Sequence, residues 1–217
     1  MGQVTPDFIL KALNETVYMV SVSLLIGTIL GLILALLLVL TRPGGIKENR
    51  IFFFILNTIV NIIRSLPFII LLVAVVPLTK LIVGRTYGTE AAIVPLIIYI
   101  APFIARLVEN SVLEVNAGII ELAKSLCATP YQIVRYFLIP EALASIVLSL
   151  TTATIGLIGA TAMAGVVGGG GIGNLAIAYG YERFNTMVIV ITVIILVVIV
   201  QIIQTVGNLI AKKLRHE

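Results

Sequence analysis

The stretch TVYMVSVSLLIGTILGLILALLLVL, residues 16–40, decides the fold class of this chain. Its only polar side chains are four small hydroxyls and one tyrosine. A helix needs about 20 apolar residues to cross a bilayer, and in lipid every backbone N–H must be satisfied within the membrane structure. We therefore expect residues 16–40 to form a membrane-spanning helix.

Four further apolar blocks follow along the chain. They cover residues 51–77, 91–107, 146–167 and 187–210. The whole chain is 60% hydrophobic and 11% charged, with a mean hydropathy of +1.19. Soluble domains have about 45–50% apolar and about 25% charged residues, so the composition excludes a soluble fold. We predict an all-α membrane protein with one domain, residues 1–217, built as a bundle of five transmembrane helices.

Basic residues divide unequally between the two ends of this bundle. The poorer end carries Lys11, Lys80, Arg85 and Arg183, and the richer end carries Arg42, Lys47, Arg50, Arg106, Lys124, Arg135, Lys212, Lys213 and Arg215. By the positive-inside rule the richer end is cytoplasmic, so we expect the N-terminus outside and the C-terminus inside the cell. These flanking residues account for the net charge of +4, and no basic run interleaved with aromatics indicates nucleic-acid binding.

The connection at residues 111–145 is long for a small bundle and lies on the cytoplasmic side. Ile119, Ala123 and Leu126 recur at helical spacing and predict a first short helix. Thr129 is placed to cap a second helix and Pro130 to begin it. We expect a turn near Cys127 between them. Periodicity alone leaves open whether this hairpin caps the bundle or binds another protein.

The second short helix has its own apolar stripe, and Pro140 is expected to end it. The stripe consists of Ile133, Val134, Phe137 and Leu138. Residues 168–173 are glycine-rich and suggest a flexible turn at the outer surface, because they follow a membrane helix rather than a strand.

No catalytic, cofactor-binding or metal site is predicted. The sequence has no G-x-x-x-x-G-K-[ST] motif to cradle ATP, and no Ser/His/Asp or paired-carboxylate arrangement lies inside a span. One cysteine and one histidine cannot build a metal cluster or an internal disulfide. These observations argue against an enzyme.

Small residues in two spans predict close helix packing. Gly27 and Gly31 form one G-x-x-x-G motif, and Gly156, Ala160 and Ala164 form a second stripe of small side chains. Packing within the chain is favoured over a contact between subunits.

Polar residues in the second span offer a different kind of site. Asn61, Arg64 and Ser65 are helical neighbours, and Pro67 weakens the helix beyond them. They form either a polar cluster at a break near a transport pathway, or a position where Arg64 reaches the lipid headgroups.

Several motifs resemble those of the permease subunits of bacterial ABC importers. The segment from Glu121-Leu122-Ala123 through Cys127 to Leu138-Ile139-Pro140 is similar to their E-A-A…G…L-P loop, with Leu122 and Cys127 in place of the usual Ala and Gly. Further segments resemble the methionine-importer permeases in particular. They begin at Thr41, Asn61, Ala101, Ala128, Pro140 and Ala162 and read TRPG, NIIRSLPFIILL, APFIAR, ATPYQIVR, PEAL and AMAG.

The resemblance implies roles for individual residues. In that family the first helix of the loop seats in a groove on a separate ATPase, which assigns ATPase coupling to Glu121, Ala123, Cys127, Ala128 and Pro130. It also places Met163 at or near the closed gate of the pathway, with ordinary packing as the alternative, and adds Arg64 and Ser65 as pathway candidates.

The family further implies a permease for methionine, L- or D-, in the bacterial inner membrane. It would act as two copies with two ATPase subunits and an external substrate-binding lipoprotein, and ATP would be used by the partner. Alternatives are another small amino acid, a stand-alone channel or secondary transporter, or a structural assembly protein.

Overall fold

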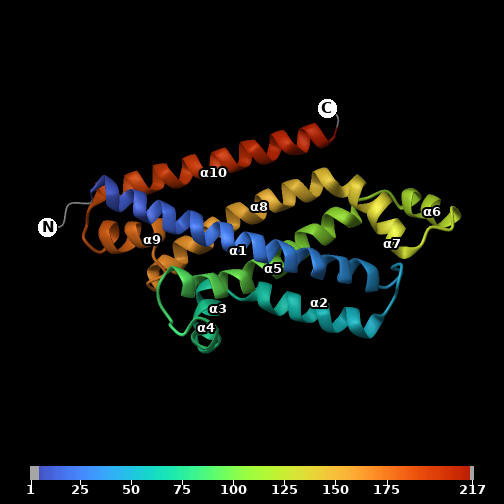
Figure 1. Cartoon of the computed structure of the whole chain (residues 1–217), viewed down its shortest axis with the longest axis horizontal. Helices are drawn as coiled ribbons and strands as arrows, with labels where there is room; N and C mark the ends of the chain where they lie inside the picture. The colour runs from blue at the N-terminus through green and yellow to red at the C-terminus, as the bar shows by residue number, and fades with distance from the viewer. Residues whose placement is uncertain (1–4, 216–217) are drawn as a thin grey trace.

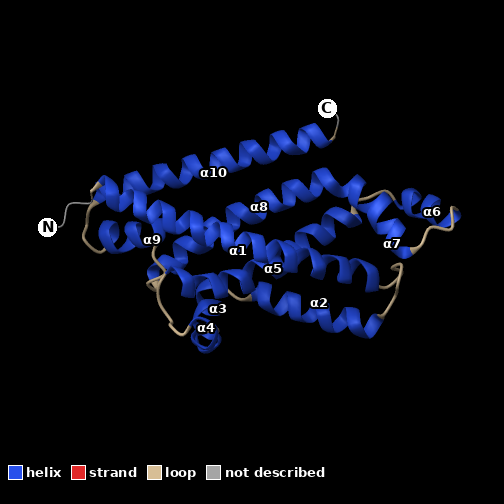
Figure 2. Ribbon diagram, in the orientation of Figure 1, coloured by secondary structure: helices blue, strands red, loops and turns tan. Residues whose placement is uncertain are grey.

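The computed structural model describes residues 5–215, which form helices joined by loops, with no strand in this range (Figure 2). Two segments, η1 and η2, are π-helical. The helices are α1 (Pro6–Thr41), α2 (Arg50–Ser65), α3 (Phe68–Ala74), α4 (Val76–Val83), α5 (Thr89–Leu113), α6 (Ala117–Ser125), α7 (Pro130–Gln132), η1 (Ile133–Leu138), α8 (Ile139–Val166), α9 (Gly171–Asn174), η2 (Leu175–Tyr181) and α10 (Thr186–Leu214).

Four helical stretches are long and apolar enough to cross a membrane: α1, α5, α10 and the continuous stretch Pro130–Val166. A fifth crossing results if α2 and α3 are counted as one bent span. Figure 1 shows α5 in the middle of the bundle, with α1 and α8 alongside it. Leu96, Ile100 and Ile104 of α5 have no exposed surface, so this helix forms the centre of the core.

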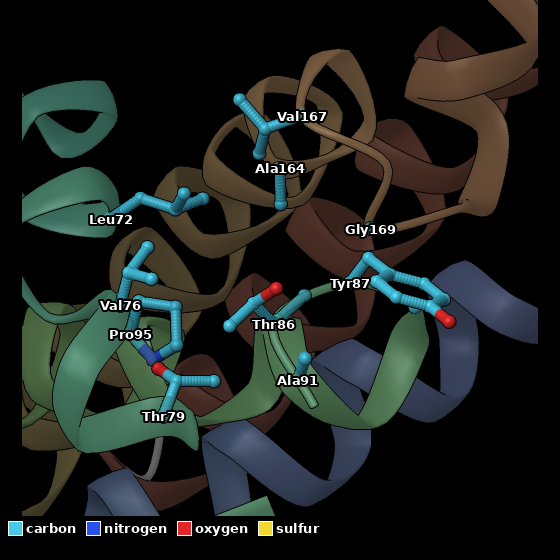
Figure 3. Close-up of a pocket in the computed structure, with 12 residues that line it drawn as sticks. Leu72, Val76, Thr79, Thr86, Tyr87, Ala91, Pro95, Ala164, Val167 and Gly169 are labelled. Carbon is cyan, nitrogen blue, oxygen red and sulfur yellow. The ribbon is translucent and has the colours of Figure 1, made fainter. Parts of the chain in front are cut away.

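The second span is broken at Pro67, as the sequence predicts. Leu66 is extended (φ −82°, ψ 128°), and α3 leaves α2 at an angle of 108°. A proline disfavours the helical conformation of the residue before it, which ends α2 at Ser65. Figure 3 shows α3 and α4 beside α5 and the end of α8, around a cavity of about 20 Å³ whose lining includes Leu72, Thr79 and Pro95.

The G-x-x-x-G motif of α1 packs within the chain, as predicted. A Cβ atom on Gly27 would collide with Ile100, and one on Gly31 would lie 2.9 Å from the carbonyl oxygen of Ala101. The absence of side chains lets the backbones of α1 and α5 come into close contact.

The glycine-rich segment 168–173 is packed rather than flexible, which corrects the sequence interpretation. A Cβ on Gly173 would collide with the backbone of Ala162. The backbone N–H of Gly171 donates to the Glu15 carboxylate at 2.8 Å, and that of Ile172 donates to the Thr16 hydroxyl at 2.8 Å. These α1 side chains satisfy N–H groups that the start of α9 would otherwise leave unpaired, so the segment is fixed to α1.

Candidate functional site

The hairpin between α5 and α8 is the most distinctive surface feature of the chain. Figure 1 shows α6 and α7 projecting beyond the end of the bundle at which α1 ends and α2 begins. The Asn116 side chain caps α6 by accepting from the Gly118 N–H at 2.8 Å. Ala123 is fully buried, and α6 packs against η1. The hairpin is therefore a folded element with its own packing.

Cys127 forms the turn after α6. Its φ is +55°, in the left-handed region that glycine adopts without cost. Its N–H donates to the Lys124 carbonyl at 2.9 Å, and the Ala128 N–H donates to the Ala123 carbonyl at 3.1 Å. This pair of bonds is a Schellman motif, which usually has glycine at the Cys127 position. The left-handed turn is thus kept despite the cysteine.

Replacing Cys127 with glycine should stabilise α6 by about 1 kcal/mol, because it removes the steric cost of a left-handed side-chain-bearing residue. Hydrogen exchange of the α6 amides should slow accordingly. Cys127→Ala keeps the same strain and should show no slowing. Equal protection in the two variants would contradict this interpretation.

The second helix of the hairpin begins as predicted. Thr129 caps it, with the Gln132 side chain accepting from the Thr129 N–H at 2.8 Å in a capping box, and Pro130 is the first helical residue. The prediction that Pro140 ends this helix is wrong, because α7, η1 and α8 form one continuous helix, Pro130–Val166. The wider π-helical turn immediately before Pro140 relieves the clash that a proline ring makes in a regular α-helix.

The outer face of α6 exposes two leucines four residues apart. Leu122 is 55% exposed and Leu126 is 64% exposed, and Glu121 is exposed beside them. Residues at this spacing share one face of a helix. Ala123 points the other way, into the hairpin, so its contribution is internal packing. Sequence spacing placed Leu126 on the same stripe as Ala123, but the structure buries only Ala123 and exposes Leu126 together with Leu122, the residue that departs from the family motif.

A polar cluster joins α2 to α5. The Arg106 guanidinium pairs with the Glu109 carboxylate, three residues further along α5, at 2.7 Å. It also donates to the side-chain oxygens of Asn57 at 2.6 Å and Asn61 at 2.9 Å. Glu109 is only 3% exposed. The sequence had grouped Asn61 with Arg64 instead, and nothing local indicated a partner 45 residues away.

The other pathway candidates lie on open surfaces. Arg64 and Ser65 are exposed in the last turn of α2, and no ion pair to Arg64 is found among residues 5–215. Met163 is 50% exposed near the end of α8. It follows Thr152 and Gly159 along one exposed face of that helix. The single chain does not bring these residues into one enclosed site.

Known proteins that this chain resembles are described as components of membrane transport systems. The family model described as "Binding-protein-dependent transport system inner membrane component" matches residues 27–216. The "Probable D-methionine transport system permease protein MetI" of Vibrio cholerae serotype O1 is 46% identical over 97% of this chain and 93% of that protein. The "D-methionine transport system permease protein MetI" of Escherichia coli K12 is 48% identical over 72% of each chain.

Solved structures agree in fold. A chain of an inward-facing MetNI methionine ABC transporter superposes with a TM-score of 0.95 at 43% identity, covering 99% of each chain. A chain from an amino acid ABC transporter with histidines has a TM-score of 0.77 at 20% identity, over 94% of this chain and 93% of that one, which is a likeness of fold alone.

Proposed function

Because this chain belongs to the family of inner membrane components of binding-protein-dependent transport systems, we propose that it forms the translocation pathway of a methionine importer. The relatives named for methionine transport support that substrate, including the D-enantiomer. This chain lines the pathway, and a separate ATPase subunit binds and hydrolyses ATP.

The observation that carries the proposal is the folded hairpin with an exposed apolar face on α6. Two neighbouring exposed leucines, Leu122 and Leu126, are suited to binding in a groove of a partner protein. The partner is the ATPase, and the coupling surface comprises Glu121, Leu122 and Leu126, with Ala123, Cys127, Ala128 and Pro130 shaping the hairpin behind it.

One continuous helix connects the hairpin to the proposed pathway. The stretch Pro130–Val166 contains 37 residues without a break, about 55 Å at 1.5 Å per residue. Met163 lies near its far end. Closure of two ATPase subunits would therefore tilt the helix that carries Met163 and alternately open and close the pathway.

A second copy of the chain completes the pathway. The exposed face of α8 that contains Met163 and the end of α2 that contains Arg64 and Ser65 would line it between the copies.

The end of the bundle that carries the hairpin of α6 and α7 is the coupling end. With Arg42 and Lys47 near it, this end is cytoplasmic, so the N-terminus is outside and the C-terminus inside. An external binding lipoprotein delivers substrate to the opposite face.

Reconstitution tests this function. Vesicles containing this chain, its ATPase and the binding lipoprotein should accumulate labelled L- or D-methionine only when ATP is supplied on the ATPase side. Omitting the ATPase should reduce uptake to the level of empty vesicles. Uptake by this chain alone without ATP would instead favour a channel or secondary transporter, and a preference for another amino acid would reassign the substrate.

A further inference from the structure

A groove of about 380 Å³ lies at the coupling end, between the last turns of α1 and the start of the Pro130–Val166 helix. Its walls are mostly aliphatic. They include Leu36 and Leu40 from α1, Val134 from η1 and Ile139 from α8. Leu36 and Leu40 belong to the final turns of an apolar helix long enough to span the membrane, so we expect this wall to lie where hydrocarbon meets headgroups.

Two cations complete the lining of the groove. Lys47 comes from the α1–α2 connection and Arg135 from η1, and both are exposed. Neither forms an ion pair with any carboxylate in the part of the chain that the structure describes.

The nearest acidic residue along the chain is not available to Lys47. The Glu48 carboxylate accepts from the Arg50 guanidinium at 2.6 Å and from the Gly44 N–H at 3.1 Å. These bonds, that from Arg50 above all, lower the pKa of Glu48. Among residues 5–215, the positive charge of the groove is thus left without a protein counter-ion.

We propose that this groove binds an anionic phospholipid of the leaflet at the coupling end. Its phosphate would lie between the Lys47 ammonium and the Arg135 guanidinium, and an acyl chain would follow the wall formed by Leu36 and Leu40. Basic pockets beside membrane spans attract anionic headgroups in this way. Tyr131, 69% exposed at the same groove, suits the amphipathic interface.

Lipid is favoured over a soluble partner by the position of the aliphatic wall. Leu36 and Leu40 continue the apolar surface of α1, which reaches the bilayer interior. The lipid would contact α1 and η1 together and so would bias the position of the Pro130–Val166 helix, a regulatory effect beyond the proposed transport function.

A tryptophan at the groove provides the test, because the chain has none of its own. The full chain carrying Tyr131→Trp is reconstituted in equal parts phosphatidylglycerol and phosphatidylcholine, with bromine on the acyl chains of one lipid or the other. Brominated phosphatidylglycerol should quench the tryptophan more strongly. Adding Lys47→Gln and Arg135→Gln should reduce this preference by roughly fivefold per cation, about 25-fold together.

The matched control is Lys212→Gln with Lys213→Gln, which removes two cations from α10 outside the groove and should leave the preference unchanged. Equal quenching by the two lipids would overturn the proposal. So would an equal loss in the control, which would indicate a general surface charge. Loss of the preference on adding the ATPase, measured against a sample without the tryptophan, would show that the partner and not lipid covers the groove.

Discussion

Replacing Leu122 and Leu126 together with aspartate should abolish ATP-driven uptake while leaving the permease folded in the membrane. Both side chains are more than half exposed on one face of α6. Buried apolar anchors at the centre of an interface contribute about 2 kcal/mol or more each, and charges in the same groove would be buried without partners. Binding of the ATPase should weaken by about a thousandfold, measured by copurification and titration with the labelled subunit.

The control for this experiment keeps the apolar surface. Leu122→Met with Leu126→Met should retain most of the uptake, because methionine has a similar volume. An unchanged thermal midpoint of the purified aspartate variant would show that the hairpin is intact. Normal uptake by that variant would refute docking through α6. Bulky changes at Ala123 would be a poorer test, because that side chain is fully buried and a change there disrupts the hairpin itself.

Replacing Arg106 with leucine should destabilise the permease by about 3–5 kcal/mol, since it leaves the buried Glu109 carboxylate without its cation. The same change removes the hydrogen bonds to Asn57 and Asn61 that hold α2 against α5. For a chain of this length the thermal midpoint should fall by about 6–20 °C. Thermal unfolding of the purified protein, followed by circular dichroism, measures the effect.

Two comparisons separate the lost pair from a general effect of removing charge. The double change Arg106→Leu with Glu109→Leu should recover much of the stability, because no buried carboxylate is left unpaired. Arg50→Leu breaks the exposed pair with Glu48 and should leave the thermal midpoint almost unchanged. A fall in the midpoint as large for Arg50→Leu as for Arg106→Leu would contradict the importance assigned to burial.

The sequence predicted the membrane class, the all-α fold, the break at Pro67 and the capping of the second hairpin helix. These features depend on local chemistry, such as the length of apolar blocks and the Thr129–Pro130 pair. It failed where packing decides the result. Pro140 was expected to end the second hairpin helix but lies inside the continuous Pro130–Val166 helix, next to a π-helical turn, whereas Pro67 ends α2.

In the candidate site, too, contacts set by local sequence could be predicted and contacts set by tertiary packing could not. The Arg106–Glu109 pair is local and can be read from the spacing of the two residues, but the bonds of Arg106 to Asn57 and Asn61 join residues far apart in the chain. The docking leucines required knowledge of which face of α6 packs against η1. The glycine-rich segment was misread because glycines in a flexible turn and glycines in a tightly packed one have the same composition, and only the tertiary neighbours of Gly173 distinguish them.

The attachment of α9 to α1 has a consequence for the order in which the protein is made. Glu15 and Thr16 leave the ribosome 156 residues before Gly171 and Ile172, the residues they bind. At about 5–20 residues per second, roughly 8–30 s separate the synthesis of the two partners. The first span is therefore synthesised before its partners in α9, and these two contacts are completed only when the last quarter of the chain emerges. A nascent chain arrested before residue 171 would lack the two hydrogen bonds that join this end of α1 to α9.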